Sequence, residues 1–422
     1  MLTDKSKIII DNIVSTIKKT NIKSNKSKES NTTNKLIVKL FDQIIESHKF
    51  VDKNINIYRC KSISTVSSST PFIKKYVSNI DYNYVDRQII KFIETNKGLL
   101  IQYTFNLDKK YIIYFILYEK ITSKNRNSIN DRLDFYAKNM ITVILFLENY
   151  RKIGCTTDKL EIFIYLTPFE KKLPKKHEII GPKSINSGHT IPCVINSEIV
   201  VYRQEEFFKV VIHELIHSMG IELASIRSTD LEKRMRNIFN IESNFKINEA
   251  YTEFWSNFIN ILFYISLIHI YKRSLSKKLL TSLFYELYYV EKINTYIQCI
   301  KLLNHMNLKY SDLFSKNSDR LNLYREKTSV FAYFMCKLIF MNNHDKFIEF
   351  VLKNNSNILL FSNSYNIKEN KKKMDSLIKY IENNYNDLDL LNNYDTLEKW
   401  YTSKKNQSYF FHQTRMTCIE YL

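Results

Sequence analysis

The sequence predicts an α+β fold, in which an N-terminal α/β subdomain with a small mixed sheet precedes a mainly helical C-terminal subdomain. Eight of the ten glycine and proline residues lie between Gly154 and Gly220, so turns and strands are expected to concentrate there. No residue after Gly220 is glycine or proline, which favours helices in the second half. The apolar fraction of 44% is that of a globular chain.

Three segments are expected along the chain. Residues 1–35 form a flexible basic segment, because Lys18 to Lys35 is nearly all Lys, Asn, Ser and Thr and cannot bury enough apolar surface to fold. Within it, Lys7 to Ile17 has the spacing of a short amphipathic helix. Residues 36–220 form the α/β subdomain, and residues 221–422 form the helical subdomain.

Individual elements follow from periodicity. Strands are predicted over 99–105, 111–118, 160–166 and 198–203, and the first two are joined by a hairpin turn at 106–110. Helices are predicted over 132–150, 276–303, 321–341 and 346–352.

The net charge of +20 raises the possibility of a nucleic-acid partner. However, the lysine clusters are not interleaved with aromatic residues, so nucleic acid is an unfavoured partner. The apolar stretch from Phe254 to Tyr271 is interrupted by Ser, Asn and His, which indicates a buried core helix and no membrane contact.

The six cysteines contain no Cys-x-x-Cys pair. This spacing argues against a thiolate zinc site and predicts buried free thiols in a reducing compartment. Since Ile8-Ile9-Ile10 is too short for a signal-peptide core, a cytoplasmic, non-secreted protein is expected.

The pattern His213-Glu214-Leu215-Ile216-His217 lies on a helix predicted from Glu205 to Met219, with Gly220 in place for a left-handed cap. Residues four apart project from one face about one turn apart, so both imidazoles can bind one tetrahedral ion. Glu214 can reach a metal-bound water without ligating the metal. The pattern therefore predicts a Zn²⁺ site with a general base.

A catalytic zinc ion needs a third protein ligand. Downstream, the predicted helix that begins near Asn248 carries one polar stripe, made of Glu249, Glu253, Ser256 or Asn257, and Asn260. A buried stripe of this kind must face something polar or charged, and a zinc ion held by two histidines meets that need. On the residues alone, either Glu249 or Glu253 can complete the site.

The helix with His213 and His217, followed by Asn248-Glu249-Ala250 and Glu253, resembles the gluzincin branch of the zinc metallopeptidases. The resemblance implies a zincin-like fold, Glu249 as the third zinc ligand, and Glu253 as the group that orients a zinc-bound histidine. It covers about residues 185–260. The interval from His217 to Glu249 (249 minus 217, or 32 positions) is longer than in the best-known members. A capping box at Thr229 to Glu232, which opens a short helix, accounts for part of it.

The stretch from Asn186 through the His213 helix is also similar to uncharacterised metallopeptidase-like proteins of giant DNA viruses. That similarity implies a setting in the cytoplasm of an infected cell or in a virion.

The expected activity is hydrolysis of peptide bonds in a peptide or protein substrate, with Glu214 as general base. The gluzincin resemblance also implies a residue that stabilises the oxyanion, for which Tyr333 is the first choice and Arg415 the second. His189 is expected in a surface loop, or in an edge strand that pairs with extended substrate.

The alternative is a catalytically silent protein of zincin-like fold, with a structural or nucleic-acid-associated role in a virion. Glu214 favours the peptidase, because a silent protein needs no base beside the metal. The sequence defines neither the substrate nor the oligomeric state.

Overall fold

The computed structural model describes residues 2–20, 22, 30–67, 84–120, 122, 124–223, 229–316, 322–404 and 408–421. The chain divides into two compact units. The sheet unit comprises Phe41–Glu170 and Asn186–Ile221, and the helical unit comprises Met1–Leu40, Lys171–Ile185 and Glu222–Tyr421. The fold is therefore of the mixed α+β class that was predicted, but the helical unit gathers three separate stretches of the chain.

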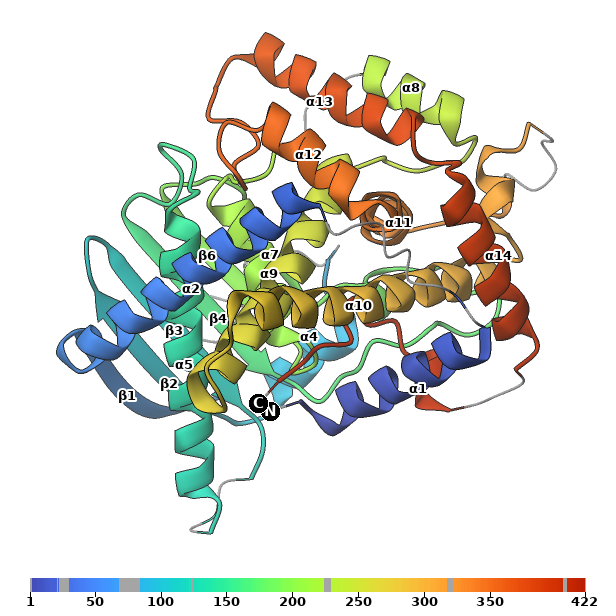
Figure 1. Ribbon diagram of the computed structural model, residues 1–422. Helices are drawn as coiled ribbons and strands as arrows, with labels where there is room; N and C mark the ends of the chain where they lie inside the picture. The colour runs from blue at the N-terminus through green and yellow to red at the C-terminus, as the bar shows by residue number, and fades with distance from the viewer. Residues whose placement is uncertain are drawn as a thin grey trace. The chain divides into compact units, whose positions relative to one another are not determined.

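A six-stranded mixed sheet forms the centre of the sheet unit, in the order β1-β2-β3-β4-β6-β5 (Figure 1). Neighbours β1-β2-β3 are antiparallel, β3-β4-β6 are parallel, and β5 pairs antiparallel with β6 at the edge. The strands are β1 (Arg59–Val66), β2 (Gly98–Asn106), β3 (Lys110–Leu117), β4 (Lys159–Leu166), β5 (Gly188–Thr190) and β6 (Asn196–Val201).

Helices cover both faces of this sheet. On one face, α4 (Arg87–Thr95) packs its isoleucines against an aromatic layer in which Tyr114 and Phe163 stack with ring centroids 4.6 Å apart. On the other face, α5 (Arg126–Glu148) and α7 (Phe207–Ser218) lie over β3 and over β5 and β6, respectively. Because both faces are covered, β3 and β4 are continuous apolar runs, as is usual for inner strands.

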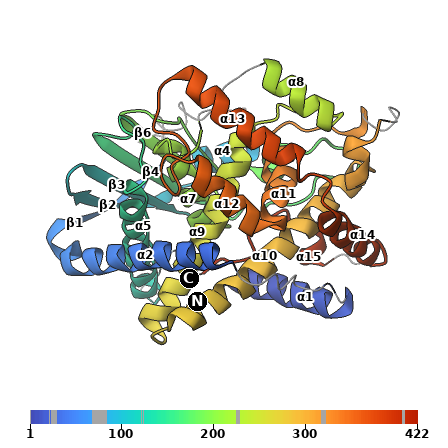
Figure 2. The ribbon, with the colours of Figure 1, turned by 45° about the horizontal axis from the view of Figure 1, so that its top comes forward.

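Long helices build the helical unit, and α1 (Asp4–Thr20), α10 (Lys277–His305) and α14 (Leu388–Thr402) lie side by side in Figures 1 and 2. The remaining helices in the described part of the chain are α2 (Asn31–Tyr58), α6 (Pro182–Ile185), α8 (Thr229–Ile238), α9 (Ile247–Tyr271), η1 (Tyr310–Phe314), the π-helix η3 (Phe331–Cys336), α11 (Lys337–Asn342), α12 (His344–Asn354), α13 (Ile367–Glu382) and α15 (Tyr409–His412).

The N-terminal segment differs from the prediction. Residues 18–20 are the end of helix α1 (Asp4–Thr20), and residues 31–35 are the beginning of α2. The prediction that these two stretches are flexible is therefore wrong. Residues 21 and 23–29 lie outside the described residues. The helix expected within Lys7 to Ile17 is confirmed, and it orders because Ile9 and Ile13 are fully buried. Leu2 pairs with Tyr421, which brings the two ends of the chain together (Figure 1).

The predicted strands and the helices over 132–150, 276–303 and 346–352 correspond to β2, β3, β4, β6, α5, α10 and α12. The helix predicted over 321–341 is wrong for most of its first half. Residues 322–323 form a short 3-10 turn, 324–329 are not helical, and continuous helix begins at Val330; residue 321 lies outside the described residues. Strand β1 and helix α4 were not predicted. Strand β1 lies at the edge of the sheet, and Ile63 in it is 48% exposed, so it lacks the apolar pattern of an inner strand.

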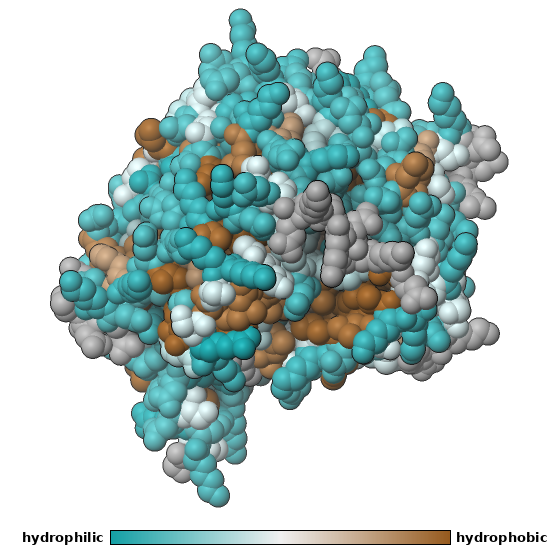
Figure 3. All heavy atoms as spheres, viewed as in Figure 1, coloured by the Kyte–Doolittle hydropathy of each residue, from teal (hydrophilic) through white to brown (hydrophobic). Residues whose placement is uncertain are grey.

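Among the described residues, α9 is the one helix long and apolar enough to cross a membrane. Its apolar window is 72% buried inside the protein, as in a core helix. The face of the molecule in Figure 3 carries mostly hydrophilic side chains, with apolar ones gathered in smaller areas.

Candidate metal centre

Helix α7 presents the metal-binding pattern from a fully buried position, since every residue from Phe207 to Ser218 is buried. It packs on β5 and β6 and against α5, where the rings of Tyr136 and Phe207 meet edge to face at 4.7 Å. Gly220 has φ +62°, which confirms the left-handed residue expected after the helix. A helix that is buried all round needs partners for its polar side chains.

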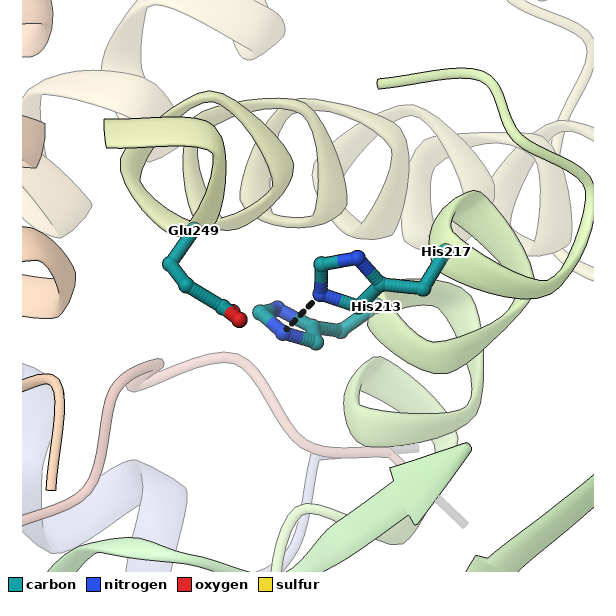
Figure 4. A group of neighbouring side chains, drawn as sticks. All are labelled: His213, His217 and Glu249. Carbon is teal, nitrogen blue, oxygen red and sulfur yellow. Dashed lines mark hydrogen bonds between the residues drawn. The ribbon is translucent and has the colours of Figure 1, made fainter. Parts of the chain in front are cut away.

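His213 and His217 lie one turn apart on α7 with their Nε2 atoms 3.2 Å apart (Figure 4). Two tetrahedral zinc ligands with bonds of 2.0–2.1 Å have nitrogens about 3.3 Å apart, so this separation already fits the ion. Either Nε2 can be the donor or the acceptor toward the other, depending on the tautomer of each ring. Both side chains are buried, with 7% and 6% of their surfaces exposed.

Glu249 is the third member of the group. It lies in the first turn of α9, and its carboxylate points toward the two imidazoles in Figure 4. The ligand atoms of His213, His217 and Glu249 all lie within 4.8 Å of one another. They form the one group among the described residues whose His, Cys, Asp or Glu side chains could hold a metal ion.

The chemistry of this donor set fits zinc. Two imidazole nitrogens and one carboxylate oxygen are the ligands of the open catalytic zinc sites of peptidases, which leave a fourth position for water. Cysteine ligands are absent from the group, so it has no resemblance to a closed structural zinc site.

Glu214 follows His213 on α7 and is outside the ligand group. Its carboxylate lies against edge strand β5: a Cβ atom built on Gly188 would be 3.2 Å from Glu214 Oε1. The fully buried Tyr202 hydroxyl has its pKa raised, chiefly by burial and also by the nearby charge of Glu214. The carboxylate therefore lies between α7 and the edge strand β5.

The polar stripe of α9 does not face a single ion, which corrects the sequence prediction. Asn257 donates its side-chain N–H to the Met416 carbonyl at 3.2 Å, and Asn260 donates to the Ile419 carbonyl at 2.9 Å. Backbone carbonyls, and not zinc, therefore accept hydrogen bonds from Asn257 and Asn260, the C-terminal part of the stripe.

Glu253 is fully buried and lies 3.4 Å from Lys337 Nζ, which also donates to the Met416 carbonyl. Its charge is therefore balanced within the helical unit. Whether Glu253 also orients a histidine ligand stays a prediction.

The segment that receives these bonds, residues 413–421, crosses the helical unit without regular structure. Glu291 on α10 accepts the backbone N–H groups of Cys418 and Ile419 at 2.9 and 3.1 Å, and also the Thr417 hydroxyl. Burial raises the pKa of Glu291, and these donors oppose that rise. Polar side chains of α9 and α10 thus make the hydrogen bonds to this backbone that a neighbouring strand would make in a β-sheet.

The residues proposed for the oxyanion have different surroundings. Tyr333 is half-buried in the π-helix η3, which packs against α9. Helices of this kind are rare and recur at functional sites. Arg415 lies inside the 413–421 segment, fully buried, and donates to Glu420 at 2.8 Å, so it contributes to the packing of that segment. His189 lies on edge strand β5, beside the Tyr202 ring.

The cysteine prediction is partly wrong. Cys155 and Cys193 form a disulfide, whereas Cys299, Cys336 and Cys418 are buried free thiols as expected; the side chain of Cys60 lies outside the described residues. The bridge lies at the C-terminal end of α7, where the Cys193 N–H donates to the Ser218 carbonyl. A separation of 38 residues with no paired motif gave no sequence signal for it.

No protein-family model, curated protein or solved structure matches the chain.

Proposed function

We propose that this protein is a zinc-dependent metallopeptidase of zincin-like fold, with His213, His217 and Glu249 holding the ion. The observation that carries the proposal is the convergence of the ligand atoms of these three side chains within 4.8 Å, and Glu214 follows His213 directly on α7. Chance would rarely bring two buried imidazoles and a half-buried carboxylate close enough to share one ion, because burying a polar group costs free energy unless it is satisfied. The substrate is a peptide or protein.

The roles of the chain's own residues follow from their positions. Zinc in such sites supplies Lewis acidity toward the scissile carbonyl and acidifies a water molecule. Glu214 accepts the proton of the attacking water and then delivers it to the leaving amine. Tyr333 is the candidate to donate a hydrogen bond to the oxyanion. Glu253, paired with Lys337, is the candidate to fix the position of α9, the helix that carries Glu249.

Zinc content tests the ligand assignment. Wild type and Glu214→Gln should each hold about one zinc per chain after dialysis, and Glu249→Ala should hold almost none. Glu369→Ala is the matched control, because Glu369 also lies in the first turn of a helix but is exposed on α13. Full zinc in Glu249→Ala would show that Glu249 is not a ligand.

Peptide hydrolysis tests the reaction. Quenched fluorescent peptides with free and with blocked N-termini should be cleaved by the zinc-loaded wild type, and the preferred set distinguishes exopeptidase from endopeptidase action. Glu214→Gln should lower kcat by about 10²–10⁴-fold with zinc retained, because the general base is removed. Unchanged hydrolysis in Glu214→Gln would exclude the proposed mechanism.

A further inference from the structure

Gly188 occupies a position on strand β5 where its backbone does not require glycine. It pairs with Val201 of β6, and its φ lies outside the left-handed region that other residues avoid. Any residue could adopt this backbone, so the reason for glycine must be space.

The space at Gly188 is taken by helix α7. A Cβ atom there would lie 2.8 Å from Val210 Cγ1, 3.0 Å from the Val200 carbonyl oxygen and 3.2 Å from Glu214 Oε1. Real Cβ atoms essentially never approach other atoms below 3.0 Å, and between 3.0 and 3.4 Å the neighbour must give by a few tenths of an ångström. Strand β5 and α7 therefore approach as closely as they do only because this residue lacks a side chain.

We propose that Gly188 is a positioning residue for Glu214: by letting α7 lie directly on the edge strand, it fixes the Glu214 carboxylate against the β5 backbone. The inference rests on the proposed function, in which Glu214 is the general base. A carboxylate held in this way has little freedom to swing away from the reacting water, and a displacement of about 1 Å from productive geometry can cost about 10²-fold in rate.

A simpler explanation is that Gly188 serves packing alone, since Val210 is its nearest neighbour. The two explanations differ in what happens when Glu214 no longer acts as a base. If Gly188 works through Glu214, its substitution has no further effect on turnover in Glu214→Gln. If it serves general packing, its effect persists.

The experiment is a double-mutant cycle on peptide hydrolysis by the zinc-loaded full chain. Gly188→Ala should lower kcat by about 10–10²-fold with zinc content unchanged, whereas Gly188→Ala/Glu214→Gln should be within about twofold of Glu214→Gln. The control is Gly98→Ala, on β2 of the same sheet, where the new methyl would lie 2.9 Å from Ile116 Cγ2. It introduces a similar clash away from the centre and should leave kcat within about twofold of wild type.

An equal loss of kcat in both backgrounds, or a matching loss in Gly98→Ala, would overturn the positioning role. Failure of the proposed function appears separately, as wild type without zinc or hydrolysis. In that case a crystal structure of metal-free Gly188→Ala remains decisive: the Glu214 carboxylate should have moved by a few tenths of an ångström relative to wild type, and an unmoved carboxylate would refute the inference.

Discussion

Helices α7 and α9 are both buried and both carry polar side chains, but the two sets of side chains meet different surroundings. On α9, Asn257 and Asn260 face backbone carbonyls, so donors meet acceptors. On α7, His213 and His217 face each other with two nitrogens of the same kind. Complementary partners indicate a structural role, whereas converging groups of like chemistry indicate a site for a third species.

The largest expected effect separates the two helices directly. His217→Ala should reduce bound zinc from about one per chain to near zero and abolish hydrolysis, because one of three ligands is lost. Asn257→Ala should keep its zinc and lose about 0.5–1.5 kcal/mol of stability, because the Met416 carbonyl loses one of its two donors and keeps Lys337. Metal analysis and urea unfolding of both variants check this. Zinc loss in Asn257→Ala would contradict the purely structural role assigned to Asn257.

The second effect concerns how α7 is held at its C-terminal end. The Cys155–Cys193 bridge closes a loop of 38 residues, for which chain entropy gives a stabilisation of about 4 kcal/mol. Dithiothreitol should therefore lower the unfolding free energy of wild type by about that amount, and should not affect Cys155→Ala/Cys193→Ala. Cys299→Ala, which removes a buried free thiol, serves as the control. Identical unfolding curves with and without reductant would contradict the bridge.

A third effect concerns the acceptor that holds the 413–421 segment. Glu291→Ala should cost about 3 kcal/mol, because the Cys418 N–H and the Thr417 hydroxyl lose this buried acceptor and the Ile419 N–H keeps only Thr417 Oγ1. Glu291→Gln keeps one acceptor oxygen and should cost less. Glu286 lies on the same helix and is exposed, so Glu286→Ala should change stability by less than about 0.5 kcal/mol. Denaturant titrations of the three variants measure this order.

The smallest expected effect is on stability at low pH, and it contrasts His213 and His217 on α7 with His48, a buried histidine outside the metal centre. Burial lowers the pKa of His48 on α2 to about 4, from 6.5. The folded state therefore favours the neutral ring, so the stability is fully present above pH 6.5 and is lost as the pH falls toward 4. Wild type should lose about 2 kcal/mol more than His48→Leu between pH 7 and pH 5, with equal zinc in both at pH 7. The exposed His412 provides the control, and His412→Leu should match wild type in this loss.

Much of the fold was predictable because it depends on local patterns. Strands β2, β3, β4 and β6 and helix α10 have strong apolar periodicity, and the spacing of His213 and His217 fixes their common face. Strand β1 was missed because an edge strand needs few apolar residues.

The partners of the α9 stripe could not be predicted because they lie far along the chain. The sequence shows that Asn257 and Asn260 are polar on an apolar helix, but not that the carbonyls they meet belong to residues 416 and 419. A metal ion and a backbone carbonyl both satisfy a buried polar group, so a stripe alone cannot distinguish them.

The distance between these partners also bears on how the protein is made. Asn257 and Met416 are 159 residues apart, so at 5–20 residues per second α9 leaves the ribosome roughly 8–30 s before the segment that satisfies it. During that interval an apolar helix with open amides is a natural target for chaperones. We expect chains stalled before residue 413 to be cut by protease within 247–271, and released full-length chains to resist.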